Sequence, residues 1–241
     1  MNDASNGAPP HQGAPLHGSA RIRGVLFDLD GTLIDTAPDM GDALNELLVE
    51  RGKPVLPAIA IRPHVSNGAS ALIRLGFGEP GAESFAKLLE RFLAIYSTRL
   101  TRTSVPFPGV LELLDALERS NTPWGVVTNK AGWLAVPLLQ ALGLAPRASS
   151  ILSGDSLAER KPHPRPLLVA AEQMSVTAAE CVYLGDAERD MQAARAAGMQ
   201  AVVARYGYLG TQDPCERWPA DAWVDSAVEF TSWWSARRAT V

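Results

Sequence analysis

The chain has 241 residues, of which 46% are hydrophobic and 20% charged, and its formal net charge is −4. These values are typical of a folded globular protein, and the absence of a basic block excludes a sequence-independent nucleic-acid surface. No apolar run reaches the length of a membrane span, and residues 1–20 lack the basic start and apolar stretch of a signal peptide. The two cysteines, Cys181 and Cys215, have no metal-ligand spacing, and Cys181 is expected to be a buried reduced thiol.

The first ordered element is predicted at residues 24–28, because residues 1–20 are rich in Gly, Pro, Ser and Asn and read as a disordered tail. The apolar run "GVLFD" predicts a buried strand that ends in Asp28, and Asp30 follows two residues later. In extended backbone these two carboxylates point the same way, while Leu29 points into the core. Gly31 allows a sharp turn directly afterwards. Paired carboxylates with an open face favour a hard cation such as Mg²⁺.

Two simpler interpretations of "DLDG" compete with a metal site. An EF-hand calcium loop requires Gly at its sixth position and Glu at its twelfth, where this chain has Leu33 and Asp39. A turn or helix-cap aspartate without a function is the other alternative.

Residues 37–103 are predicted to form a helical insertion. "APDMGDALNELLVERG" places apolar residues on one helical face, and Thr36 is a candidate N-cap. The polar stretch 61–73 is the candidate for substrate specificity: Arg62 and His64 could meet a carboxylate, and Ser66, Asn67 and Gly68 could supply short polar contacts. A solvated connector between helices is the alternative interpretation of this stretch.

From residue 104 onward, strands and helices alternate. Further strands are predicted at 124–129, 181–186 and 201–206, and helices at 109–120, 165–174 and 191–199, the last one ended by Gly198. The alternation predicts an α/β fold with a doubly wound parallel sheet, in which ligands bind beyond the C-terminal ends of the strands. The predicted organisation is a tail at 1–20, an α/β core at 21–36 and 104–230, a helical insertion at 37–103, and a C-terminal tail or helix at 231–241. Trp233 and Trp234 in that last segment are expected to pack on the core, with an interaction patch as the alternative.

Polar residues follow the later strands as well. Thr128 and Asn129 could hold phosphate oxygens through a hydroxyl and a backbone N–H, and Lys161 could be a phosphate counter-ion. Asp186 could complete the metal shell, with Asp190 orienting it from one helical turn away. Taken singly, each of these also fits an ordinary turn, a surface lysine or a helix-start acid.

The segments "FDLDGTLIDT", "VVTNK", "KP" and "GDAERD" resemble, in this order, the four motifs of the haloacid dehalogenase superfamily. The insertion after the first motif is similar to the small helical cap of the phosphoglycolate phosphatase-like branch. The resemblance implies a Rossmann-like core, Asp28 as nucleophile and Asp30 as general acid and base. It also implies Mg²⁺ bound by Asp28, the Asp30 carbonyl and Asp186, and a phosphoryl group held by Thr128 and Lys161.

The resemblance implies a Mg²⁺-dependent phosphatase of carbohydrate metabolism that acts on a small acidic phosphomonoester, with 2-phosphoglycolate first. N-acetylmuramic acid 6-phosphate is the alternative substrate, since a branch acting on it shows similar "WGVVTNK" and "RYGY" segments. A sugar-phosphate mutase and a non-catalytic phosphate-binding module remain rival functions. We expect a cytoplasmic monomer or homodimer that binds neither nucleic acid nor membranes.

Overall fold

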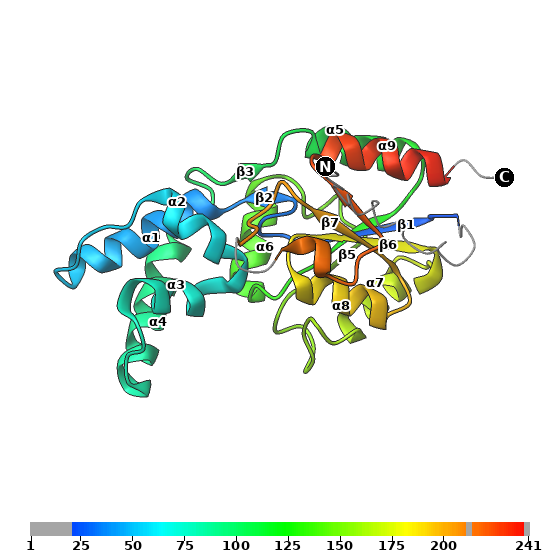
Figure 1. The fold of residues 1–241 in the computed structure, drawn as a ribbon. Coiled ribbons are helices and arrows are strands. Elements are labelled where there is room, and N and C mark those ends of the chain that lie inside the picture. Colours follow the sequence, from blue (N-terminus) through cyan, green and yellow to red (C-terminus); the bar gives the residue numbers. More distant parts are fainter. Residues whose placement is uncertain (1–20, 211–213, 239–241) are drawn as a thin grey trace, which may run out of the picture.

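The computed structural model describes residues 21–210 and 214–238, so the expected tail at 1–20 lies outside the described residues. Six parallel strands form the central sheet in the order β5-β4-β1-β6-β7-β8 (Figure 1). Its strands are β1 (Gly24–Phe27), β4 (Trp124–Val127), β5 (Ser150–Leu152), β6 (Cys181–Gly185), β7 (Gln200–Ala204) and β8 (Ala222–Val224). The predicted α/β class with a doubly wound parallel sheet is therefore confirmed.

All four predicted strands are present, and each ends one or two residues earlier than predicted. β5 and β8 were not predicted, because each is only three residues long and is too short to show the longer apolar run by which the others were found. Both lie at the edges of the sheet, where a strand has a hydrogen-bonding neighbour on one side only.

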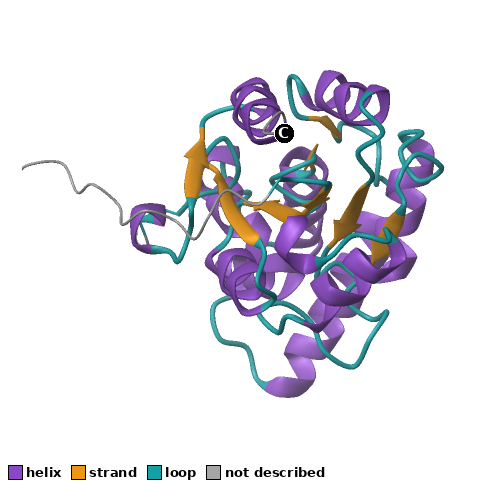
Figure 2. Ribbon diagram, turned by 90° about the vertical axis from the view of Figure 1, so that its right-hand side faces the viewer, coloured by secondary structure: helices purple, strands orange, loops and turns teal. Residues whose placement is uncertain are grey.

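Helices cover both faces of the sheet (Figure 2). Alternate side chains of the strands point to opposite faces: Phe27 and Val126 pack with one apolar cluster, and Leu26 and Tyr183 pack with the other. The first face is covered by α5 (Val110–Arg119), α6 (Gly132–Ala141) and α9 (Ala227–Arg238), and the second by α7 (Arg165–Gln173) and α8 (Glu188–Ala196).

Two core helices differ from the sequence prediction by more than one residue at an end. α6 was not predicted, and it carries Pro137 in its interior. α8 begins at Glu188, three residues before the predicted start, because the Asp190 carboxylate accepts the Ala187 N–H at 3.0 Å and so caps an earlier first turn. Gly198 follows the helix with a φ of +74°, as expected of a helix stop.

Between residues 37 and 103 the described elements are all helical. These are α1 (Ala37–Glu50), α2 (Ala58–Ile61), the 3-10 helix η1 (Arg62–Asn67), α3 (Gly68–Phe77) and α4 (Ala82–Ser97). A short antiparallel pair, β2 (Ile34–Asp35) and β3 (Val105–Pro106), joins the exit from the core to the return (Figure 1). Thr36 precedes α1 but does not cap it: its hydroxyl donates to Asp30 Oδ1 at 2.6 Å instead.

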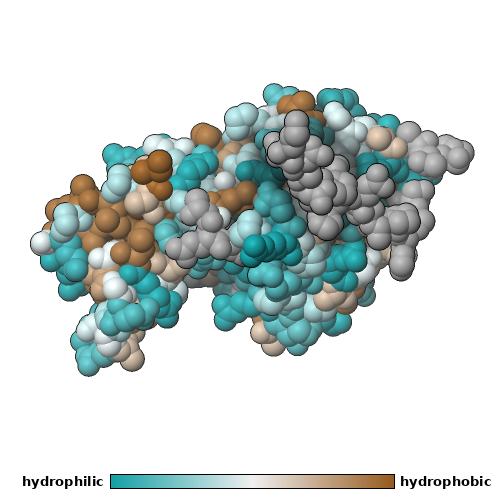
Figure 3. Space-filling model, viewed as in Figure 1, coloured by the Kyte–Doolittle hydropathy of each residue, from teal (hydrophilic) through white to brown (hydrophobic). Residues whose placement is uncertain are grey.

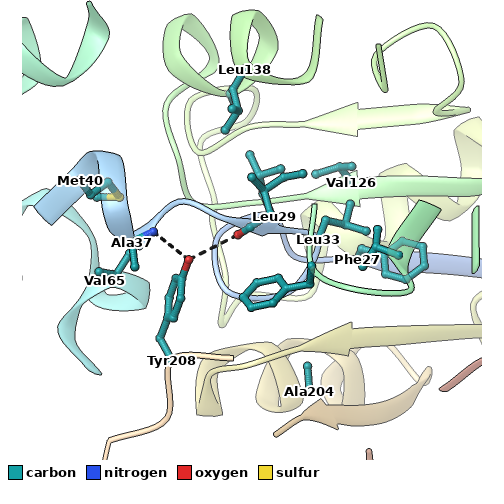
Figure 4. Close-up of a cluster of buried hydrophobic side chains, with 14 of the residues drawn as sticks. Phe27, Leu29, Leu33, Ala37, Met40, Val65, Val126, Leu138, Ala204 and Tyr208 are labelled. Atoms are coloured by element: carbon teal, nitrogen blue, oxygen red, sulfur yellow. Dashed lines mark hydrogen bonds between the residues drawn. The ribbon is translucent and has the colours of Figure 1, made fainter. Parts of the chain in front are cut away.

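One apolar cluster continues from the sheet into the helical insertion (Figure 4). Leu29 is fully buried in it, as predicted, together with Met40 of α1 and Val65 of η1. The Tyr208 hydroxyl accepts the Ala37 N–H at 2.9 Å and so connects the loop after β7 to the start of α1. The insertion is therefore packed onto the core at the C-terminal edge of β1.

Three smaller predictions can be compared with the structure. Cys181 is buried and free, and burial raises the pKa of its thiol to about 12, so it is an unreactive core residue. Trp234 is buried, and Trp233 stacks on Phe230. None of the helices in the described part of the chain has the length and apolar character needed to span a bilayer.

The insertion also carries apolar residues on its outer surface, which Figure 3 shows as brown areas over its helices. Ile59 of α2 is the most exposed of them, and Val55 lies nearby in sequence.

Candidate active site

Three buried carboxylates converge where β1 and β6 end. Phe27 of β1 pairs with Leu184 of β6, so the two strands end side by side, and Asp28 and Asp186 both follow these strand ends. One oxygen each of Asp28, Asp186 and Asp190 lies within 4.8 Å of the others. The carboxylate of Asp30 is not part of this group.

Lys161 is the cation that faces this group. Its ammonium lies 2.9 Å from Asp28 Oδ1 and 2.9 Å from Asp190 Oδ1, and it donates to the Tyr183 hydroxyl at 2.7 Å. Burial alone would lower the pKa of Lys161, but Asp190 and Asp28 outweigh burial and raise it. The side chain of Lys161 is only 1% exposed, so its charge acts at close range in a region without bulk water.

The group of three carboxylates has an excess of negative charge. Three ionised carboxylates against one ammonium leave two negative charges uncompensated. Burial, followed by the charges of Asp28 and Asp190, raises the pKa of Asp186 to about 7. Burial likewise raises the pKa of Asp190, although Lys161 opposes the shift. An all-oxygen donor set with an excess of two negative charges fits a hard divalent cation.

Two glycines make room for Asp186. Gly31 has a φ of +86°, and a Cβ there would lie 2.1 Å from Asp186 Oδ2. A Cβ on Gly207 would lie 2.4 Å from the Asp186 Cβ. The prediction that Gly31 forms a sharp turn is confirmed, while Gly207 was not identified from the sequence.

Thr128 and Asn129 follow β4 as predicted, but their side chains differ in what they contact. Thr128 is buried and its hydroxyl accepts the Lys130 N–H at 3.2 Å. The Asn129 amide binds the backbone of Lys161 twice, donating to its carbonyl at 2.9 Å and accepting its N–H at 3.1 Å. The side chain of Asn129 thus positions Lys161. The backbone N–H of Asn129 is then the group of this residue that is expected to bind phosphate.

A cavity of about 420 Å³ opens beside this site, between the strand ends and the helical insertion. Asp28, Asp30, Thr128 and Asn129 line it from the core. The insertion contributes the three small residues predicted from the sequence, Ser66, Asn67 and Gly68, as well as Met40, Val65, Phe92, Leu93 and Tyr96. Ser66 also donates to Asp186 Oδ2 at 2.5 Å, so the insertion contacts the carboxylate group directly.

Arg62 and His64 do not line this cavity. Arg62 donates to both oxygens of Asp35, at 3.0 and 2.9 Å, and its guanidinium lies 4.8 Å from the centre of the Tyr208 ring. A guanidinium paired and stacked in this way is not available to a ligand in the cavity. His64 lines a second cavity of about 730 Å³, which shares Ser66 and Asn67 with the first.

Several cavity residues were not identified as site residues from the sequence. Lys130 donates to Asp30 Oδ1 at 3.0 Å, and although burial opposes its charge, Asp30 and Tyr96 raise its pKa. Arg160 and Arg189 also line the cavity, and Arg189 donates to Asn67 Oδ1 at 3.1 Å and to the Ser66 carbonyl. All three lie within or beside the motif segments, and this position in the sequence could have identified them as candidate site residues.

The fold and this site define a class of protein: α/β proteins that gather buried aspartates at the C-terminal ends of the strands of a parallel sheet. A family model described as haloacid dehalogenase-like hydrolase matches residues 25–204. The chain belongs to this family.

Curated relatives match a larger share of the chain. It is 48% identical to a phosphoglycolate phosphatase of Xanthomonas campestris pv. campestris, over 86% of this chain and 94% of the relative. It is 40% identical to an N-acetylmuramic acid 6-phosphate phosphatase of Pseudomonas putida, over 87% of this chain and 95% of the relative. Among solved structures, a predicted phosphoglycolate phosphatase from Haemophilus somnus matches with a TM-score of 0.79 and 28% identity, over 88% of this chain and 97% of that one.

Proposed function

We propose that the protein is a Mg²⁺-dependent phosphatase that hydrolyses a small acidic phosphomonoester, with 2-phosphoglycolate as the first candidate. The observation that carries this proposal is the meeting of Asp28, Lys161, Asp186 and Asp190 at one edge of the sheet, beside a cavity. The relatives named as phosphoglycolate phosphatases, at 46–48% identity, support the substrate.

In the proposed reaction, a carboxylate oxygen of Asp28 attacks phosphorus and the bond from phosphorus to the substrate oxygen breaks. Asp30 gives its proton to the departing oxygen, which leaves as the alcohol, here glycolate. A water molecule then attacks the aspartyl-phosphate, Asp30 takes one of its protons, and phosphate is released with Asp28 restored. Lys161 and Thr128 hold the phosphoryl oxygens throughout.

Charge neutralisation is the main physical problem, because an anionic nucleophile must approach a dianionic phosphate. Enzymes accelerate the hydrolysis of phosphate monoesters by up to ~10²¹-fold, largely through positioning and electrostatics. Asp28, Asp186 and the Asp30 carbonyl would hold Mg²⁺. Asp190 would orient the site through its ion pair with Lys161. Bound Mg²⁺ would supply positive charge to the phosphoryl oxygens.

N-acetylmuramic acid 6-phosphate is a second candidate substrate, and the size of the cavity favours it. A volume of about 420 Å³ lies in the range of ~300–1,000 Å³ that is usual for drug-sized ligands, and exceeds what a two-carbon acid requires. Trp133, which is 52% exposed, lines the cavity and offers a flat apolar surface to a sugar ring. Both candidates carry a carboxylate, so the need for a cation does not separate them.

Phosphate release from a panel of phosphomonoesters in the presence of Mg²⁺ tests the proposal. We expect turnover of 2-phosphoglycolate or N-acetylmuramic acid 6-phosphate, and a loss of kcat of ~10³-fold or more in Asp28→Asn, because the nucleophile is removed. Turnover that is unchanged in Asp28→Asn would overturn the mechanism. Isomerisation of a sugar phosphate with little phosphate release would instead indicate a mutase, and binding without turnover would indicate a non-catalytic module.

A further inference from the structure

Lys130 connects the general acid of the proposed reaction to the helical insertion. Its ammonium lies 3.0 Å from Asp30 Oδ1 and donates to the Tyr96 hydroxyl at 2.8 Å. It also lies 4.5 Å from the centre of the Tyr96 ring. Tyr96 belongs to α4, so this lysine bridges the loop after β4 and a helix of the insertion. The side chain of Lys130 is only 5% exposed, which gives the interaction a dry surrounding.

Both side chains that bind Asp30 donate to the same oxygen. Thr36 Oγ1 reaches Oδ1 at 2.6 Å, and Lys130 reaches Oδ1 at 3.0 Å. No hydrogen bond from the described residues, 21–210 and 214–238, reaches Oδ2. Two donors from different segments fix the rotamer of Asp30, which lines the cavity.

This asymmetry has a chemical consequence. In a protonated carboxyl group, one oxygen is an acceptor and the other carries the proton. Since Oδ1 already accepts two hydrogen bonds from the protein, Oδ2 is the oxygen left to bind a group in the cavity. The oxygen without a protein partner is thus the one that can exchange a proton with a ligand in the cavity.

We propose that Lys130 is a positioning residue for Asp30. Together with Thr36 it holds Oδ1, so that Oδ2 faces the leaving oxygen of the substrate and then the attacking water. Its hydrogen bond to Tyr96 makes this orientation depend on the packing of α4 over the cavity. The inference rests on the proposed phosphatase function and assigns to the insertion a part in proton transfer.

The dependence on the leaving group tests this role. An alkyl phosphomonoester such as 2-phosphoglycolate needs a proton on its leaving oxygen, whereas the nitrophenolate of p-nitrophenyl phosphate departs without one. In Lys130→Met we expect kcat for 2-phosphoglycolate, or for N-acetylmuramic acid 6-phosphate if that is the substrate turned over, to fall ~10²-fold with KM nearly unchanged. The pre-steady-state burst of nitrophenolate, which reports only the transfer of phosphate to Asp28, should change less than ~3-fold, since that transfer needs no proton from Asp30.

Three further variants complete the design. Lys130→Arg keeps the charge and should recover part of the lost kcat. Tyr96→Phe keeps Lys130 and removes only one of its hydrogen bonds, so it should show a weaker effect with the same selectivity. Lys87→Met places the same substitution on the exposed side of α4, where Lys87 pairs with Glu83, and should leave both rates unchanged.

Two results would overturn the inference while leaving the proposed function intact: Lys130→Met slowing both substrates equally, or slowing neither. If Lys130→Met does not fold, as judged by circular dichroism, the same comparison in Tyr96→Phe decides. A wild-type protein that releases phosphate from none of these esters would overturn the proposed function itself and, with it, the role of Lys130.

Discussion

Asp28 and Lys161 illustrate what the site requires of single residues. Their charged atoms lie 2.9 Å apart and both side chains are almost fully buried. Burying such a pair adds little net stability, because desolvation costs about as much as the attraction returns. A buried pair at the end of a strand is therefore better explained by chemistry than by folding.

Also at residue scale, Arg160 is the residue that we expect to bind the carboxylate of the proposed substrate. It lines the cavity and precedes Lys161 directly in sequence. No ion pair or side-chain hydrogen bond from the described part of the chain reaches it, in contrast to Arg62, which is held by Asp35. Arg160→Gln should lower kcat/KM for 2-phosphoglycolate roughly 10–100-fold, the loss expected for a charge-assisted hydrogen bond of about 1.5–3 kcal/mol.

The control for Arg160 is a pair of substrates. 2-Hydroxyethyl phosphate lacks the carboxylate, so its kcat/KM should be nearly the same in Arg160→Gln and in the wild type. Arg62→Gln should leave the preference between the two esters unchanged. A preference that depended on Arg62 and not on Arg160 would restore the original sequence prediction.

At the scale of elements, the start of α1 is fastened to the segment that returns from the insertion. The fully buried carboxylate of Asp39 accepts hydrogen bonds from the backbone and hydroxyl groups of Thr103 and Ser104, at 2.6 to 3.0 Å. These bonds cross between the two places where the chain passes from the core to the insertion. Asp39 thereby fixes the connection on which the position of the insertion depends.

Replacing Asp39 by Asn should destabilise the protein by on the order of 2 kcal/mol, since charge-assisted bonds are lost and buried donors remain. Burial opposes the charge of Asp39, but the bonds from Ser104 and Thr103 outweigh it and lower its pKa below the ordinary value of 3.8. A lowered pKa contributes stability that is present above pH 3.8 and is lost as the pH falls through the lowered value. The difference between wild type and Asp39→Asn in urea unfolding should therefore shrink at strongly acid pH.

Asp42→Asn is the matched control for Asp39, because Asp42 is exposed on the same helix. It should change the free energy of unfolding by less than ~0.5 kcal/mol. An equally small effect of Asp39→Asn would show that the connection does not depend on this carboxylate.

At the scale of the whole molecule, the three buried carboxylates make the stability of the fold depend on pH and, if the proposed function holds, on a bound cation. The folded-state pKa of Asp186 is raised from 3.8 to about 7, so the metal-free folded protein binds more protons than the unfolded chain between these values. Its stability should consequently fall as the pH rises from about 4 to about 7. A divalent cation offsets the same repulsion that a proton relieves at lower pH.

Mg²⁺ should therefore raise the Tm more at pH 8 than at pH 5.5. At one hundred times its Kd, Mg²⁺ would contribute about 2.7 kcal/mol. For a chain of this size that corresponds to roughly 5–10 °C in Tm, measurable by differential scanning calorimetry. Asp186→Asn should abolish the Mg²⁺ response and raise the Tm of the metal-free protein at pH 8. A Tm that does not respond to Mg²⁺ at either pH would contradict the assignment of the carboxylates to a metal site.

The sequence by itself determined which residues meet at the strand ends. Apolar runs that stop abruptly at Asp28, Thr128 and Asp186 predict parallel strands, and the geometry of such a sheet brings their C-terminal ends to one edge. This inference needs only local patterns, and it predicted that Asp28, Lys161 and Asp186 lie close together. It also paired the carboxylates of Asp28 and Asp30, whereas in the structure the Asp30 carboxylate binds Thr36 and Lys130 and lies outside the group.

The tertiary structure alone decided what surrounds that group. Three of the surrounding contacts join residues that are 27 to 34 positions apart. They are the ion pair of Arg62 with Asp35, the hydrogen bond of Lys130 to Tyr96 and the hydrogen bond of Asn129 to Lys161. Such contacts depend on how helices of the insertion and loops of the core pack in three dimensions, and no periodicity along the chain encodes them. For the same reason the short edge strands β5 and β8 were not predicted, because their pairing is set by neighbours rather than by their own three residues.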